Sequence, residues 1–420
     1  MSIQSGESTA PAAAGDRRPS ARRHPSKTAL VLGGGGFTGG VYEIGALRAL
    51  DLLSVNHNVN QFDVYVGTSA GSMVAAMAAN GVTPEQMMQE VDSGGLLPFR
   101  EGQLGKMLRP NYREFVTKGV RLPIHLAGLL RTLGRVPASF SPVDLVVALA
   151  EGLPSGLYTG SGIEEYVHEM LSAPGRSDDF RVLDRELYIA ATDLDTCERV
   201  VLGAADWDDV PISAAVRAST AMPMLYKPVD IKERTLIDGG ISSTTNLDLA
   251  VEAGARLVIV VNPLVPFIND SGQEMNTLFG SRVKRVADMG FPKIGYQTFK
   301  LVAHQRLHDL ARHWKERYPD VDIVLIEPDT DDELMFETNV MDYASRLDVA
   351  RHGFRSVTMK LAGDYERLDQ ISRRHGIEIS ATRLQRVVEH FTAEPEKSRA
   401  WRRILEQTTG SLLRQSAAER

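Results

Sequence analysis

The sequence predicts an α/β fold built around a largely parallel β-sheet. Two observations predict it: short apolar segments typical of buried strands alternate with helical segments, and a glycine-rich turn follows the first of these strands. The chain has 420 residues, of which 43% are hydrophobic and 24% are charged, so it can bury a sizeable core. The sequence contains no internal repeat.

The first elements follow one another closely. Residues 28–32 are expected to form a buried strand, and residues 41–53 form the helix after the glycines. A second strand is expected over 62–66, followed by a helix within 72–81 that Asn80 and Gly81 close. From about residue 91 to 158 the pattern loosens into helical pieces punctuated by Leu, Gly and Pro, which indicates a helical insertion or lid.

The regular alternation then returns and sets the expected domain boundaries. Strands are expected within 185–195, 199–203, 235–240, 256–263 and 321–328. A helix is expected over 211–220, a long helical section over 275–317, and more helix after 328. We therefore expect a disordered tail over residues 1–27, one domain over 28–362 with its insertion at about 91–158, and a helical C-terminal extension over 363–420.

Charge and composition narrow the function classes. The net charge is −7 and the pI is near 5.9, so no global attraction draws the chain to nucleic acid, and no nucleic-acid partner is expected. The single cysteine, Cys197, excludes an intramolecular disulfide and is expected to be a small, partly buried residue. The first 27 residues lack the apolar core of a secretory signal, and no run approaches a membrane span. We expect a cytoplasmic protein, with peripheral contact to a membrane left open as an alternative.

The glycine-rich turn has two interpretations. Gly34, Gly36 and Gly39 fit the G-x-G-x-x-G pattern that binds a dinucleotide between a strand and a helix. That pattern also needs an acidic residue at the end of the next strand, and this strand ends in Gly67 instead. Backbone N–H groups exposed by glycines can equally hold the oxyanion of an acyl-transfer reaction, where each donor contributes roughly 3–4 kcal/mol. The second interpretation is favoured.

The second strand runs directly into a G-x-S-x-G motif. Gly67, Ser69 and Gly71 lie between this strand and the next helix, which is the context of a nucleophile elbow. The glycines are needed because neighbouring side chains would collide at so sharp a turn. We therefore expect Ser69 to be a catalytic nucleophile.

The general base is less obvious from local sequence. Asp238 ends an expected strand and precedes Gly239 and Gly240, where a carboxylate can approach a reacting group, although Asp-Gly is also a common turn. His304 and His308 are spaced i, i+4 and could form a metal pair. No carboxylate lies between them, however, and a solvated helix face is favoured. Ser69 also comes earlier in the chain than an α/β-hydrolase nucleophile usually does.

Taken together, GGGGFTGG, GTSAG, ASTAMPMLYKPV and LIDGG resemble the patatin-like phospholipases, in that family's order and approximate spacing. The resemblance covers most of residues 28–362 and implies a three-layer sandwich that hydrolyses lipid esters with a Ser–Asp dyad. It implies that Ser69 is the nucleophile and Asp238 the base, with no histidine, no metal and no other cofactor. The other implied site residues are the oxyanion donors Gly34, Gly35 and Gly36, the elbow glycines Gly67 and Gly71, and the supporting Thr38, Gly39, Gly239 and Gly240.

Two positions depart from the family's pattern. Thr38 stands where the glycine loop usually carries Arg or Lys, so one positive charge is missing near the oxyanion site. Asn246 is followed by Leu247 and Asp248, where the family usually has Asn-x-Pro. The first departure could lower activity or change head-group preference, and the second is expected to be a change in packing.

A Ser–Asp dyad requires a particular position and environment for its carboxylate. A carboxylate with an ordinary pKa near 3.9 is a poor base for a serine hydroxyl, so Asp238 should be shielded from water and within hydrogen-bond reach of Ser69.

Access to lipid and the remaining alternatives depend on weaker signals. Residues 121–135 form a basic amphipathic pattern that could contact a membrane, although a helix covering the core is slightly favoured. The segment around Trp401 is expected to be a surface or dimer helix. Alternatives to a lipid ester hydrolase are a thioesterase or small-ester hydrolase, a lipid-binding or partner-docking module on the same scaffold, and a dinucleotide-binding protein. The oligomeric state stays open.

Overall fold

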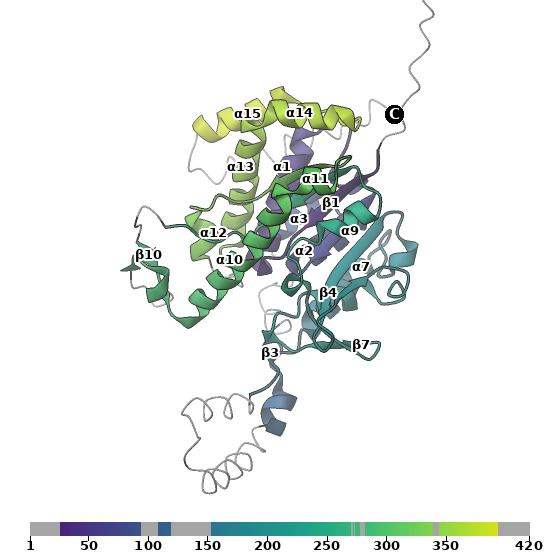
Figure 1. The fold of residues 1–420 in the computed structure, drawn as a ribbon, viewed down its shortest axis with the longest axis vertical. Helices are drawn as coiled ribbons and strands as arrows, with labels where there is room; N and C mark the ends of the chain where they lie inside the picture. The colour runs from purple at the N-terminus through teal and green to yellow at the C-terminus, as the bar shows by residue number, and fades with distance from the viewer. Residues whose placement is uncertain are drawn as a thin grey trace, which may run out of the picture.

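The computed structural model describes residues 26–93, 108–118, 153–269, 272, 274–277, 282–338 and 344–393. Within them an eight-stranded sheet is covered by helices on both faces (Figure 1). Three expectations fall wholly or largely outside these residues: the disordered tail, most of the insertion with its amphipathic segment 121–135, and the segment around Trp401.

Five parallel strands form the centre of the sheet. In spatial order they are β12 (Asp322–Ile326), β9 (Leu257–Val261), β1 (Thr28–Leu32), β2 (Val64–Thr68) and β4 (Glu186–Asp193). The antiparallel strands are β5 (Arg199–Leu202), β8 (Arg234–Asp238) and β7 (Val229–Ile231). The central strands are rich in Val, Ile and Leu because helices cover both faces of a parallel sheet.

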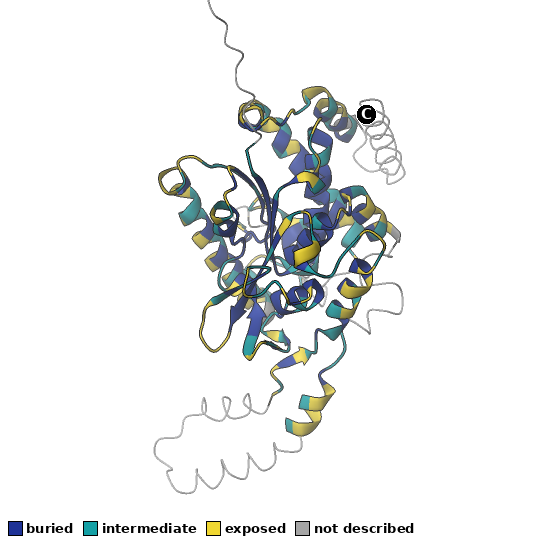
Figure 2. Ribbon diagram, turned by 90° about the vertical axis from the view of Figure 1, so that its right-hand side faces the viewer, coloured by how far each residue is buried: buried dark blue, intermediate teal, exposed yellow. Residues whose placement is uncertain are grey.

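Alternate residues of β1 belong to two different cores. Leu30 and Leu32 face the larger one, to which the following helices contribute: α1 (Gly36–Leu53), α2 (Ala70–Ala79), α3 (Pro84–Ser93), α7 (Ser161–Leu171), α8 (Ile212–Ser219), α13 (Arg346–Gly363), α14 (Tyr365–Arg374) and α15 (Ala381–Ala393). Ala29 and Val31 face the smaller core, to which α9 (Leu247–Glu252), α10 (Phe291–Arg312) and α11 (Trp314–Arg317) contribute. The result is a three-layer sandwich, as predicted, with its buried residues concentrated around the sheet (Figure 2).

Smaller elements connect these layers. They are β3 (Gly156–Tyr158), which pairs with β6 (Met224–Tyr226), the pair β10 (Met275–Asn276) and β11 (Arg282–Val283), α12 (Glu333–Glu337), and the 3₁₀ turns η1 (Val59–Gln61), η2 (Phe180–Val182), η3 (Gly239–Ile241) and η4 (Val286–Met289).

Two glycines let α1 and α13 cross closely. A Cβ on Gly45 would lie 2.3 Å from the Ala350 carbonyl oxygen, and one on Gly353 would lie 2.6 Å from the Tyr42 carbonyl oxygen. Neither position can take a side chain without moving a backbone, so this crossing fixes α1 and with it the loop that precedes it.

Two expectations are wrong. The helical section expected over 275–317 begins only at Phe291, because Met275 is buried and pairs with Val283, and Gly290 and Pro292 supply the start of α10. Cys197 is exposed rather than partly buried, because it lies in the turn between β4 and β5 with φ 60°. In the described part of the chain, no helix combines the length and apolarity needed to cross a membrane.

Candidate active site

Ser69 lies at a strained turn between β2 and α2. Its backbone has φ 53° and ψ −126°, a conformation that a residue with a side chain rarely adopts. The neighbouring glycines explain how the turn fits. A Cβ on Gly67 would lie 2.5 Å from Ser72 Cα, and one on Gly71 would lie 2.4 Å from the Gly33 carbonyl oxygen. The G-x-S-x-G segment therefore has the strand–turn–helix geometry in which a serine side chain is presented at a sheet edge.

Asp238 reaches this serine from β8, which is separated from β2 by strand β4. It is the last residue of β8, which pairs with β4 through Ala191 and Asp238. Ser69 Oγ donates a hydrogen bond to Asp238 Oδ2 at 2.6 Å, and Gly240 N–H donates to Oδ1 at 2.8 Å. Two residues that are 169 positions apart in the sequence thus lie within hydrogen-bond distance of each other, as the dyad requires.

Burial sets the electrostatics of the carboxyl group. Asp238 is 4% exposed and Ser69 is 5% exposed. Loss of solvation raises the pKa of Asp238, and the hydrogen bonds from Ser69 and Gly240 lower it. Because the effect of burial is larger, the pKa lies at about 6. A carboxylate in this environment is a stronger base than one in water, while it remains ionised at neutral pH.

Gly239 is as constrained as the elbow glycines. A Cβ there would lie 2.1 Å from the Ala190 carbonyl oxygen, so the turn after Asp238 packs directly on β4. The Asp-Gly-Gly motif therefore allows the carboxyl group to lie against the neighbouring strand.

The glycine loop lies beside the serine, but its N–H groups differ in availability. A Cβ on Gly34 would lie 3.3 Å from Ser69 Cβ. The Gly34 N–H donates to the Thr244 carbonyl oxygen at 2.9 Å and is engaged. Gly35 precedes α1 and Gly36 is its first residue, and among the described residues no acceptor takes either N–H. These two remain the donors that a bound anion could use.

Ser219 is a site residue that sequence reasoning missed. It ends α8, and its Oγ accepts the Ser69 N–H at 2.9 Å while donating to the Ala190 carbonyl oxygen at 2.6 Å. The hydroxyl is fully buried. It lies within the ASTAMP motif, so the signal was present, but nothing local shows that this serine faces the elbow.

Among the described residues, no histidine is hydrogen-bonded to the side chain of Ser69 or Asp238. In the described part of the chain, the polar partners of the Ser69 and Asp238 side chains are each other and the Gly240 N–H. The site therefore pairs a serine hydroxyl with a carboxylate directly.

Comparison with known proteins identifies the family of this chain. The profile of the family described as Patatin-like phospholipase matches residues 30–251. This span is more than half of the chain and contains the glycine loop, the elbow and Asp238. The chain belongs to the patatin-like phospholipase family.

Individual relatives are distant. The chain is 25% identical over 242 residues to the uncharacterized protein YqhO of Bacillus subtilis strain 168, covering 54% of this chain and 70% of YqhO. Among solved structures, VipD from Legionella pneumophila aligns with a TM-score of 0.37 and 15% identity, covering 81% of this chain and 67% of VipD. The type III effector ExoU of Pseudomonas aeruginosa aligns with a TM-score of 0.33 and 17% identity over 80% of this chain and 52% of ExoU, so this chain spans about half of that protein.

Both departures from the patatin-like motif have a structural setting. Thr38 lies on α1 and is 4% exposed, so the position is part of the interior. Asn246 is fully buried, and its Nδ2 donates to Thr68 Oγ1 at 2.9 Å, next to the nucleophile. Asp248, two residues later, forms a 2.7 Å ion pair with Arg199. The Asn is thus retained as a support of the elbow, and Asp248 stands where the family usually has proline.

Proposed function

We propose that this chain hydrolyses carboxylic esters of phospholipids or related lipids through a Ser69–Asp238 dyad. Membership of the patatin-like phospholipase family supports a lipid acyl hydrolase at the level of the family. The observation that carries the finer proposal is the 2.6 Å hydrogen bond from Ser69 Oγ to a carboxylate shielded from water.

In the proposed reaction Asp238 Oδ2 takes the proton of Ser69 as Oγ attacks the ester carbonyl carbon. The N–H groups of Gly35 and Gly36, at the N-terminus of α1, hold the negative charge that develops on the carbonyl oxygen. As the carbon–oxygen bond of the ester breaks, Asp238 returns the proton to the leaving alcohol. Water, deprotonated by the same carboxylate, then attacks the acyl carbon. The bond from that carbon to Ser69 Oγ breaks, Asp238 returns the proton to Oγ, and the fatty acid is freed.

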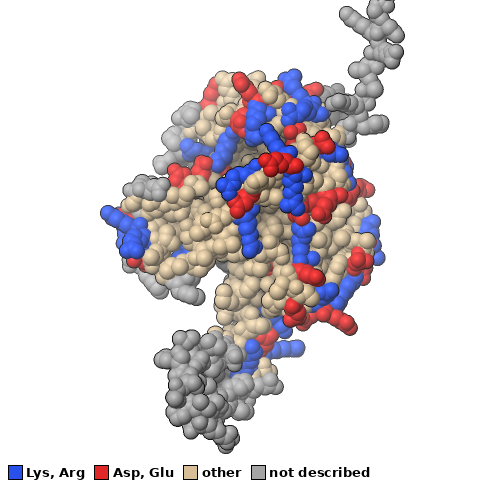
Figure 3. Space-filling model, viewed as in Figure 1, with Lys and Arg blue, Asp and Glu red and all other residues tan. Residues whose placement is uncertain are grey.

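A cavity of about 340 Å³ begins at Gly240, two residues after Asp238, and supports an apolar substrate. Its walls include Phe299, Val302, Leu307 and Leu310 of α10, and the hydroxyl residues 242–245 with Arg306 form its polar part. Because ligand sites are mostly apolar with a few polar groups, we propose that this cavity accepts part of the acyl chain. On the face that Figure 3 shows, Lys and Arg are interspersed with Asp and Glu, so this face does not carry one sign of charge.

The membrane is the proposed source of substrate, and a cytoplasmic protein that contacts it peripherally is the proposed setting. Fatty-acid release from phospholipid in mixed detergent micelles tests the function. Wild type should release fatty acid, while Ser69→Ala and Asp238→Asn should lose at least about a thousandfold in kcat/KM, the scale of losing a nucleophile or its base. Faster turnover of acyl thioesters or short-chain esters than of phospholipid would favour the thioesterase or small-ester alternative. Unchanged activity in Ser69→Ala would contradict the proposal.

A further inference from the structure

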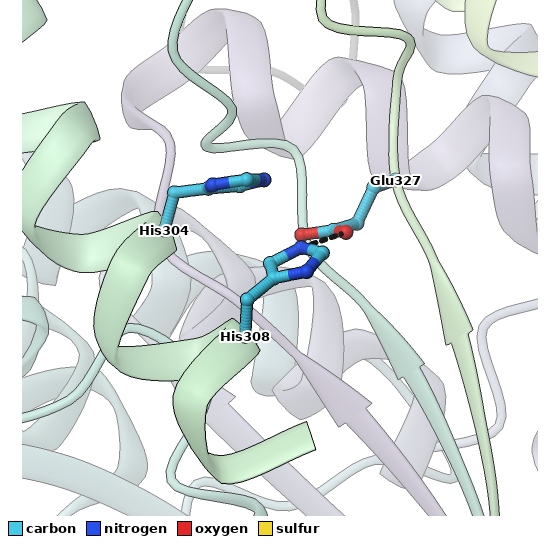
Figure 4. A group of neighbouring side chains, drawn as sticks. All are labelled: His304, His308 and Glu327. Carbon is cyan, nitrogen blue, oxygen red and sulfur yellow. Dashed lines mark hydrogen bonds and ion pairs between the residues drawn. The ribbon is translucent and has the colours of Figure 1, made fainter. Parts of the chain in front are cut away.

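Two histidines of α10 and a glutamate after β12 form a cluster away from the Ser69–Asp238 pair. His304 and His308 are one helical turn apart, and Glu327 directly follows the last residue of β12 (Figure 4). One nitrogen of each imidazole and one oxygen of the carboxylate all lie within 4.8 Å of one another. Both histidines lie on a partly solvated face of α10: each is half-buried, and the His308 side chain is 43% exposed.

The carboxylate is held in place from behind. Asn262 Nδ2 donates to Glu327 Oε1 at 2.7 Å, which leaves Oε2 to face His308 Nε2 at 2.8 Å. The Glu327 side chain is 12% exposed. Outer hydrogen bonds of this kind orient the ligands of metal sites. Glu327 is therefore a fixed acceptor rather than a mobile surface acid.

The two imidazoles face one another closely. Their ring centroids are 4.0 Å apart and their planes are tilted by 33°. The two rings therefore present their nitrogens to the same small volume beside Glu327. His304 has no hydrogen bond with a described residue, and its free nitrogen lies beside the His308–Glu327 pair.

We propose that His304, His308 and Glu327 bind one divalent transition-metal ion of the zinc type. Two imidazoles and one carboxylate are a donor set that zinc accepts, with a fourth position left to water. Zinc bonds of about 2.0–2.2 Å place tetrahedral ligands about 3.4 Å apart, so a small rotation of side chains converts the present cluster into a site. The proton between His308 Nε2 and Glu327 Oε2 is what the ion replaces.

The site would clip α10 to the carboxyl end of the sheet. Glu327 follows β12, and Asn262, which is hydrogen-bonded to it, follows β9. The two histidines belong to α10, which packs on one face of the same sheet. An ion that binds the folded chain but not the unfolded chain would raise the stability of the fold by mass action. The spacing of the two histidines was visible in the sequence. In H-E-x-x-H the carboxylate lies between the two histidines, whereas here it comes from another element.

The test measures Zn²⁺ binding to the full chain, stripped of metal and carrying Ser69→Ala so that acyl hydrolysis plays no part. Competition with a chromogenic chelator should show one ion per chain. His304→Ala removes one ligand and leaves the His308–Glu327 hydrogen bond intact, and it should weaken Zn²⁺ binding more than the about 10–100-fold that losing an outer-shell partner costs. Glu327→Gln should do the same. Zn²⁺ should also raise the thermal midpoint of the parent chain but not of His304→Ala.

His313→Ala is the matched control, because His313 lies at the end of the same helix, is exposed, and lies outside the cluster. It should bind Zn²⁺ like the parent chain. Millimolar Ca²⁺ should not compete, since a hard cation disfavours imidazole. Absence of stoichiometric binding, an unchanged affinity in His304→Ala, an equal loss in His313→Ala, or full competition by Ca²⁺ would each overturn the site. If Glu327→Gln does not fold, His304→Ala alone decides.

Discussion

The backbone N–H of Ser69 donates to Ser219 Oγ, and the same hydroxyl donates to the Ala190 carbonyl oxygen. One buried hydroxyl therefore joins the strained elbow, the end of α8 and strand β4. This relay holds Ser69 at φ 53°, a conformation that persists only when its surroundings fix it.

Ser219→Ala tests this support. It removes the acceptor of the buried Ser69 N–H and one donor to the Ala190 carbonyl oxygen, so the free energy of unfolding should fall by about 1–3 kcal/mol, and ester hydrolysis should slow as the nucleophile loses its position. Urea unfolding and kcat/KM are the two measurements. Ser172→Ala, at an exposed helix end, is the control and should change neither by much. A fully active and equally stable Ser219→Ala protein would show that the relay does not position the elbow.

The pH dependence of hydrolysis reports on the base. Protonated Asp238 cannot accept the proton of Ser69, and its pKa lies at about 6 because of burial. With an uncharged ester, kcat/KM should be constant above pH 7 and fall about tenfold per pH unit well below 6. A profile that stays flat down to pH 4 would argue against a buried carboxylate as the base.

The same burial predicts how stability responds to pH. Folding raises the Asp238 pKa from 3.8 to about 6, so the folded chain binds a proton more tightly than the unfolded chain. The contribution to stability is therefore complete below about pH 3.8 and is lost as the pH rises through 6. Asp238→Asn lacks this change and should gain about 2–3 kcal/mol relative to wild type between pH 4 and 7. Urea titrations across this range measure the difference, and one that does not grow with pH would contradict the assignment.

Gly71 should tolerate no side chain. Its Cβ would lie 2.4 Å from one backbone oxygen and 2.5 Å from another, so Gly71→Ala must move the glycine loop or α2. We expect a loss of about 2 kcal/mol or more in the free energy of unfolding, together with loss of hydrolysis. Gly295→Ala is the control, since a Cβ there meets nothing within 4 Å and lies inside a helix, where alanine is favoured. Equal stability of the two variants would show that the elbow yields more readily than its geometry indicates.

Features that depend on neighbouring residues could be predicted from the sequence, whereas features that depend on distant residues could not. The strands around Ser69 and Asp238 were predictable because each apolar run ends in a glycine motif whose chemistry is fixed by a few neighbouring residues. Ser219 and Glu327 were missed because an ordinary serine or glutamate gains its role only from partners far along the chain. Met275 was assigned to a helix because a short strand held by one partner leaves no periodicity.

Gly34 shows a finer limit of the same kind. The glycine pattern identified the loop, but only the position of Thr244 decides that the Gly34 N–H is already engaged. A motif thus locates an anion site, whereas the fold decides which N–H groups remain available to it.

Covalent labelling by a fluorophosphonate, with intact-mass readout, tests the central claim most directly. Wild type should gain one adduct, and Ser69→Ala and Asp238→Asn should gain none, because the probe reports an activated serine rather than any particular substrate. Labelling that persists in Asp238→Asn would contradict the dyad and point to another base. A folded wild type that remains unlabelled, even with detergent present to open the site, would contradict an activated Ser69 and leave the chain a lipid-binding module.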